Sequence, residues 1–103
     1  MWVCFNNAFV SAVENRNDKS QLVIRARRRE HLEELFPDEE IIEAGSTDYN
    51  WRVFVPKEQF AELVKQSILD INYDNFKNSV KEHDLHMLYA RFWNLHYQFQ
   101  KYS

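Results

Sequence analysis

Apolar and polar positions alternate through much of the first half of the chain, and this two-residue period is typical of β-strands. The first apolar run, residues 2–13, predicts a strand that begins almost at the first residue. A polar turn at residues 15–20 follows, and residues 21–27 alternate again, so the two runs predict an antiparallel hairpin. Two more strands are predicted at residues 40–44 and 49–55.

Elsewhere the apolar side chains recur at three- and four-residue intervals, which predicts helices. The first helix spans residues 28–36 and ends before Pro37. The second begins with Pro56 as its first helical residue, where a missing N–H costs no hydrogen bond. The strand–turn–strand–helix order thus occurs twice, and it fits either an internal repeat or two units that each need an amphipathic helix. The two helices superpose at a shift of 28 residues, with Leu32, Leu35 and Phe36 on Phe60, Leu63 and Val64.

After Asp70 the pattern is helical to the end of the chain, with Asp74 placed to cap a short helix. A longer C-terminal helix carries one apolar stripe, and Trp93 and Tyr97 lie beside it. The stripe consists of Leu85, Leu88, Tyr89, Phe92, His96 and Phe99. We therefore predict a single α+β domain over residues 1–103. It has a four-stranded, mainly antiparallel sheet from two β-β-α units, with additional C-terminal helices packed on one face.

The composition agrees with a small packed domain and excludes several classes of protein. Aromatic residues make up 16% of the 103 residues, enough large rings to fill a core. With Gly45 as the only glycine, no P-loop, dinucleotide fingerprint or nucleophile elbow can be built. The single Cys4 excludes an intramolecular disulfide, is typical of a reducing compartment and is expected to be a buried small hydrophobe. No leader or membrane span is visible, so we expect a soluble, cytoplasmic protein.

The net charge of −3 hides an uneven distribution of charged residues. Residues 14–29 hold six basic and two acidic side chains, whereas residues 30–48 hold eight acidic side chains and no Lys or Arg. On a strand, Arg25 and Arg27 point to the same face about 7 Å apart, and Arg52 joins them if its strand is a neighbour. Such arginines either pair with the acidic segment or bind phosphates, nucleic acid or a partner's carboxylates. The candidate anion- or partner-binding residues are Arg25, Arg27, Arg28, Arg29 and Arg52.

Two further groups of residues suggest surfaces. Asp48, Tyr73 and Lys77 lie where polar turn-forming residues adjoin large rings. They are explained by turn chemistry, or they converge with the arginines on one polar pocket. Trp93 and Tyr97 exceed what one apolar stripe needs, so they either close over the sheet or form an exposed face for a partner or a second copy.

No arrangement of residues indicates catalysis or metal binding. His83 and His86 lie three residues apart, but His96 is about 15 Å further along the same helix and His31 is on another helix. Neither a carboxylate pair nor a nucleophile with an orienting base can be identified. We therefore expect no metal, no cofactor and no enzymatic activity.

Segments spread over nearly the whole chain carry a resemblance to known sequences. They are Met1-Trp2, Ala8-Phe9-Val10-Ser11-Ala12-Val13, Leu22-Val23-Ile24-Arg25-Ala26-Arg27, Gly45-Ser46-Thr47-Asp48-Tyr49 with Arg52, Ile71-Asn72-Tyr73-Asp74-Asn75-Phe76-Lys77 and Tyr89-Ala90-Arg91-Phe92-Trp93. In this order they resemble a family of short bacterial proteins of about 100 residues, hypothetical proteins without an assigned activity. The family carries Asp where this chain has Asn72, and Gly-Thr-Asp-Tyr where this chain inserts Ser46. The resemblance implies a bacterial, soluble, single-domain product and adds no catalytic or ligand-binding residue.

The sequence favours a non-enzymatic interaction or regulatory module that binds another macromolecule, with an unknown protein or a second copy as its partner. A first alternative is nucleic-acid or phosphate contact through Arg25–Arg29, which the acidic net charge does not favour. A second alternative is an inhibitor encoded by a phage or another mobile element, which no specific residue supports. No membrane contact is expected.

Overall fold

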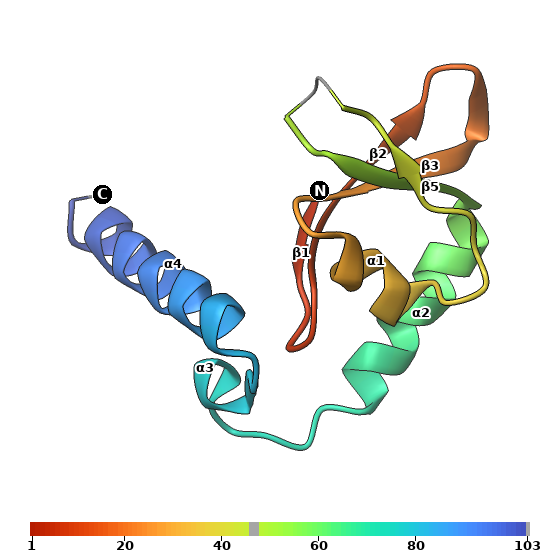
Figure 1. Cartoon of the computed structure of the whole chain (residues 1–103). Helices are drawn as coiled ribbons and strands as arrows, with labels where there is room; N and C mark the ends of the chain where they lie inside the picture. The colour runs from red at the N-terminus through yellow and green to blue at the C-terminus, as the bar shows by residue number, and fades with distance from the viewer. Residues whose placement is uncertain (46–47, 103) are drawn as a thin grey trace.

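The computed structural model describes residues 1–45 and 48–102. One antiparallel sheet of five strands, in the order β1-β2-β3-β5-β4, forms its centre (Figure 1). The elements in chain order are β1 (Trp2–Cys4), β2 (Phe9–Asn15), β3 (Asp18–Ala26), α1 (Arg29–Leu35), β4 (Ile42–Glu43), β5 (Trp51–Pro56), α2 (Lys57–Leu69), α3 (Phe76–Ser79) and α4 (His83–Lys101). The predicted α+β class and the antiparallel sheet are confirmed.

The prediction of four strands is wrong, because the first apolar run is two strands and not one. The chain turns back at Asn6 and Asn7, both exposed, and the N–H of Phe5 donates to the carbonyl oxygen of Ala8 at 2.8 Å. β1 then pairs with β2, with Trp2 opposite Ser11. Asparagine favours such a turn, and here it outweighs the strand preference of its apolar neighbours.

One face of the sheet is covered by α1 and α2. Strand alternation points Val10, Ile24 and Val53 to this face, and all three are fully buried. Leu32 and Phe36 from α1 and its end pack here, as does Phe60 from α2. The first two helices thus lie where the sequence predicted them, except that Pro56 caps α2 and Lys57 is its first residue.

The remaining helices lie on the other side of the β1–β2 hairpin, which corrects the prediction that the helices share one face. Phe9 alternates with Val10 and so points away from α1 and α2, into a second cluster with Val80, Leu85 and Tyr89. Figure 1 shows α4 on one side of the hairpin and α1 and α2 on the other. The early turn makes this arrangement, because it gives the hairpin two apolar faces that both need cover.

Side-chain hydrogen bonds cap the N-terminal ends of the last two helices. Asn75, and not the predicted Asp74, caps α3, accepting a hydrogen bond from the N–H of Asn78 at 3.1 Å. Glu82 caps α4 by accepting from the N–H groups of Asp84 and Leu85 at 3.0 and 2.7 Å. These two N–H groups hold the pKa of the Glu82 carboxyl below its usual range.

Two further expectations concern single segments. The turn predicted over residues 45–48 begins at Gly45, whose φ of 70° suits a turn, but Ser46 and Thr47 lie outside the described residues. Within residues 1–45 and 48–102, none of the helices combines the length and the apolar content that crossing a membrane requires.

Candidate anion-binding face of the sheet

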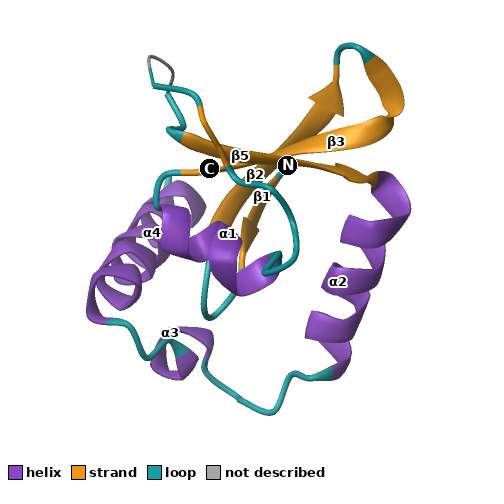
Figure 2. Cartoon of the chain, turned by 45° about the vertical axis from the view of Figure 1, so that its right-hand side comes forward, coloured by secondary structure: helices purple, strands orange, loops and turns teal. Residues whose placement is uncertain are grey.

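The register of the sheet brings three of the predicted arginines together. Arg25 on β3 lies directly opposite Arg52 on β5, and Arg27, just after the end of β3, shares the Tyr49 ring with Arg25. Their common side faces away from α1 and α2, and Figure 2 shows both of these helices on the same side of the sheet. We call Arg25, Arg27 and Arg52 the arginine face. The predicted grouping of these arginines required the strands of Arg25 and Arg52 to be neighbours, and the pairing of β3 with β5 confirms this.

A single tyrosine ring supports two of these side chains. The Cζ atoms of Arg25 and Arg27 lie 4.6 and 4.3 Å from the centre of the Tyr49 ring. Tyr49 is only 5% exposed, although it lies in the loop before β5. Guanidinium groups held over an aromatic face lose little further freedom on binding a ligand, so the ring preorganises the arginine face.

The hydrogen-bond partners of Arg25 and Arg27 are neutral. Arg25 donates from Nη2 to the buried hydroxyl of Ser11 at 3.0 Å, and its Nε is buried without a hydrogen-bond partner. Arg27 donates from Nη1 to the backbone carbonyl oxygen of Asp48 at 2.7 Å. No ion pair joins either arginine to a carboxylate in the described part of the chain. Their positive charges therefore remain available to an external anion.

The next two arginines have a different environment. Arg28 pairs with Asp84 at the start of α4 at 2.9 Å and approaches Glu30 at 4.0 Å. The Asp84 carboxylate raises the pKa of the Arg28 guanidinium. Arg29 pairs with Glu33 one turn along α1 at 3.9 Å. The basic stretch thus divides: Arg25 and Arg27 face outward with neutral partners, while Arg28 and Arg29 pair with acidic side chains.

Apolar side chains adjoin the arginine face in the next row of the sheet. Val13, Val23 and Phe54 lie opposite one another on β2, β3 and β5, two residues from the row that holds Ser11, Arg25 and Arg52. Val13 and Phe54 are 36% and 39% exposed. At the edge, Ile42 of β4 lies opposite Arg52 and is 38% exposed. A ligand on this face meets guanidinium groups and apolar surface together.

Tyr73 and Lys77 lie in a different cavity from the arginines. Both line a space of about 510 Å³ beside α3 and α4, where the Lys77 Nζ lies 5.2 Å from the Trp93 ring. Asp48 does join the arginine face, but through its backbone carbonyl. The structure therefore groups Asp48 with the arginines and Tyr73 with Lys77.

Trp93 and Tyr97 stack on each other on the surface of α4. Their ring centres are 5.7 Å apart and their planes differ by 11°. Both rings remain more than half exposed. The two rings therefore do not close over the sheet, and their role as a face for a partner or a second copy stays a prediction.

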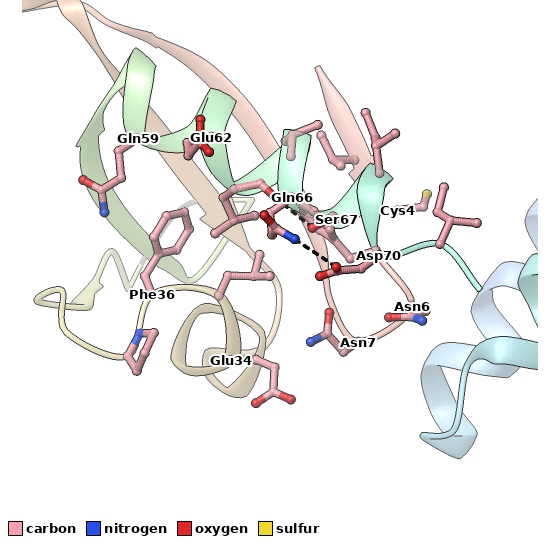
Figure 3. Close-up of a pocket in the computed structure, with 18 of the residues that line it drawn as sticks. Cys4, Asn6, Asn7, Glu34, Phe36, Gln59, Glu62, Gln66, Ser67 and Asp70 are labelled. Atoms are coloured by element: carbon pink, nitrogen blue, oxygen red, sulfur yellow. Dashed lines mark hydrogen bonds between the residues drawn. The ribbon is translucent and has the colours of Figure 1, made fainter. Parts of the chain in front are cut away.

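A groove on the opposite side of the molecule was missed by the sequence analysis. Its volume is about 970 Å³, and its walls are α2, the end of α1 and the β1–β2 turn (Figure 3). Carboxylates from three segments line it, including Glu34, Glu62 and Asp70, the last of which accepts a hydrogen bond from Gln66 at 2.9 Å. The acidic run at residues 30–48 was a signal for it, but the contribution of α2 depended on the fold. The molecule thus has a cationic face and an anionic groove.

The histidines and the cysteine have structural contacts. His31 accepts from the N–H of Phe9 at 3.2 Å, and partial burial lowers its pKa. His86 Nδ1 lies 2.7 Å from the carbonyl oxygen of Lys77. No group of three or more His, Cys, Asp or Glu side chains is placed to hold a metal ion in the residues that the structure describes. Cys4 is exposed on the edge strand, contrary to prediction, and the partial burial of its thiol raises the thiol pKa.

Comparison with known proteins adds no relative: no family model, no curated protein and no solved structure matches the chain. The resemblance to short bacterial proteins therefore stays a prediction.

Proposed function

We propose that this chain is a non-enzymatic binding module whose arginine face holds an acidic segment of a protein partner. The observation that carries the proposal is the preorganised pair Arg25 and Arg27, stacked on Tyr49 with neutral hydrogen-bond partners. Guanidinium groups stay protonated at physiological pH and donate in a fixed fork that matches carboxylates. Such groups are suited to binding an anion and not to proton transfer.

The surroundings of the face favour a protein segment over a nucleic acid. Exposed Val13, Ile42 and Phe54 adjoin the guanidinium groups, so a segment with carboxylates next to apolar side chains fits both surfaces. A long polyanion also meets the rest of a chain whose net charge is −3. The three clustered arginines match a short acidic segment better than an extended phosphate backbone.

The test uses a fluorescently labelled ten-residue peptide of alternating glutamate and leucine as the probe. Fluorescence anisotropy should show saturable binding, and the Arg25→Gln/Arg27→Gln double variant should weaken it at least about tenfold, since charge-assisted hydrogen bonds are lost. The matched control is Arg28→Gln/Arg29→Gln, which removes the same charge from residues already paired with carboxylates. It should leave the affinity within about twofold.

Three outcomes overturn the proposal. One is that the peptide does not bind the wild-type protein, and another is that both double variants weaken binding equally, which indicates net charge alone. The third is that a labelled single-stranded oligonucleotide of equal charge binds more tightly, with an affinity that falls steeply as salt rises. That result selects nucleic-acid contact instead.

A further inference from the structure

One set of apolar side chains on α4, together with Tyr102 at its C-cap, follows the seam spacing of a coiled coil. They recur at alternating intervals of three and four residues, and this is the period that keeps one face of a helix turned toward a partner helix. The seam consists of Leu85, Leu88, Phe92, Leu95, Phe99 and Tyr102.

The two halves of the seam differ in how far the rest of the chain buries their side chains. Leu85 is 3% exposed, and Leu88 and Phe92 pack in the cluster around Phe9. Beyond Phe92 the cover ends: Leu95, Phe99 and Tyr102 are 58%, 78% and 80% exposed. Figure 1 shows the C-terminal end of α4 standing apart from β1. The exposed half is thus the direct continuation of a packed helix face.

We propose that two copies of this chain pair through α4 in antiparallel orientation, each covering the exposed half of the other. In an antiparallel pair, the intervals between seam residues must be the same in both chain directions. The intervals from Phe92 through Leu95 and Phe99 to Tyr102 are three, four and three, so they meet this condition. In this register Leu95 lies beside Phe99 of the second copy, and Phe92 lies beside Tyr102 of the second copy.

Charge and shape agree with self-association. From Phe92 to Tyr102 the only Lys, Arg, Asp or Glu is Lys101, so little like-charge repulsion opposes the pairing. A cavity of about 580 Å³ beside Phe92 is lined by Trp2 and Leu88, and Trp2 is 69% exposed. Tyr102 of the second copy, placed opposite Phe92, lies at this cavity.

The exposed area fits a small interface between two copies. Taking about 150–250 Å² for each fully buried ring, Trp2, Phe99 and Tyr102 together with Leu95 offer roughly 400–650 Å² per copy. Stable interfaces bury about 600–1,000 Å² per partner. The estimate reaches this range only at its upper limit, so we expect a weak dimer, one that forms at micromolar concentrations of the chain.

Sedimentation velocity over a concentration series tests the proposal. The wild-type chain should reach twice the monomer mass at high concentration, and Phe99→Asp should weaken dimerisation at least about tenfold, as expected for a central ring of an interface. Tyr97→Asp is the matched control, because Tyr97 is an exposed ring two residues away, about 200° around the helix. It should leave the dimer intact. Circular dichroism confirms that both variants stay folded.

Disulfide trapping tests the orientation. In a Cys4→Ser background, mixed Leu95→Cys and Phe99→Cys chains should form mainly the heterodisulfide. Homodisulfides at both positions indicate a parallel pair and overturn the antiparallel arrangement. A wild-type chain that stays monomeric at about 100 μM, well above the micromolar range of weak but specific association, overturns the proposal altogether. So does a Phe99→Asp variant that dimerises like the wild type. These results test the pairing through α4 and not the binding of an anion, although Arg27 and Tyr49 of the arginine face also line the cavity beside Phe92.

Discussion

His31 illustrates how a single side chain couples stability to pH. Its neutral imidazole accepts the N–H of Phe9, and partial burial lowers its pKa in the folded state. The unfolded chain therefore takes up the proton first as pH falls below about 6.5, the ordinary histidine value. The stability that His31 contributes is present above this pH and is lost as pH falls toward the folded-state pKa.

We predict that the urea midpoint of the wild-type protein is lower at pH 5.5 than at pH 7.5. His31→Gln should reduce this difference, since the glutamine side-chain oxygen can accept the same hydrogen bond without titrating between these pH values. His83→Gln changes an exposed histidine at the start of α4 and should keep the wild-type difference. An equal pH dependence in all three proteins contradicts the assignment.

At the residue scale, sequence alternation placed Arg25 and Arg27 on one side of a strand; β3 ends at Ala26, and the two guanidinium groups meet over the Tyr49 ring. It could not distinguish them from Arg28 and Arg29, because their partners come from remote parts of the chain. Arg28 pairs with Asp84, 56 residues away, and Arg27 rests on Tyr49. Local pattern therefore identified the cationic stretch, while tertiary contacts decide which of its charges are already neutralised.

At the element scale, Tyr89 attaches α4 to the β1–β2 turn. Its hydroxyl lies 2.9 Å from the carbonyl oxygens of both Phe5 and Ala8 and shares its proton between them. Burial raises the pKa of Tyr89, so the donor stays protonated at any physiological pH. Tyr89→Phe keeps the ring and removes the donor, which leaves the buried Phe5 carbonyl oxygen without this partner.

Tyr89→Phe should therefore lower the free energy of unfolding by about 1–3 kcal/mol, measured by urea denaturation. Tyr97→Phe removes the hydroxyl of a half-exposed tyrosine on the same helix and should change this free energy by less than about 0.5 kcal/mol. Equal effects of the two substitutions show that the hydroxyl of Tyr89 does not hold α4 to the hairpin.

The sequence predicted best those elements in which apolar side chains recur at regular intervals. The stretches that became α1 and α2 carry apolar side chains at helical spacing and adjoin prolines, so local physics alone placed them within one residue of their observed starts. The first strand pair was not predicted because Phe5 and Ala8 are apolar and both are buried. The apolar pattern therefore continues across the turn between them and does not mark it. The side of the hairpin that α4 covers depends on Phe9, whose direction follows from that turn.

At the scale of the whole molecule, the uneven charge along the chain becomes an uneven charge in space. The sequence showed a basic segment followed by an acidic one, and the sheet places the arginine face apart from the acidic groove. The composition of the groove could not be read from the chain, because Glu62 and Asp70 reach it only through the packing of α2 beside α1. Like charges gathered in this way repel one another, so bound counter-ions stabilise the fold.

Inorganic phosphate should therefore act as a ligand of the folded chain through the arginine face. A ligand that binds only the folded state at ten times its dissociation constant adds about 1.4 kcal/mol, which raises the melting temperature of a domain of this size by about 5–10 °C. We predict such a rise for the wild-type protein in about 10 mM phosphate relative to chloride at equal ionic strength, where general salt effects are matched. Arg28→Gln/Arg29→Gln should show the same rise, and Arg25→Gln/Arg27→Gln should lose it. A rise that survives in the second variant places the bound anion elsewhere on the molecule, and its absence from all three proteins shows that the guanidinium groups over Tyr49 do not form an anion site.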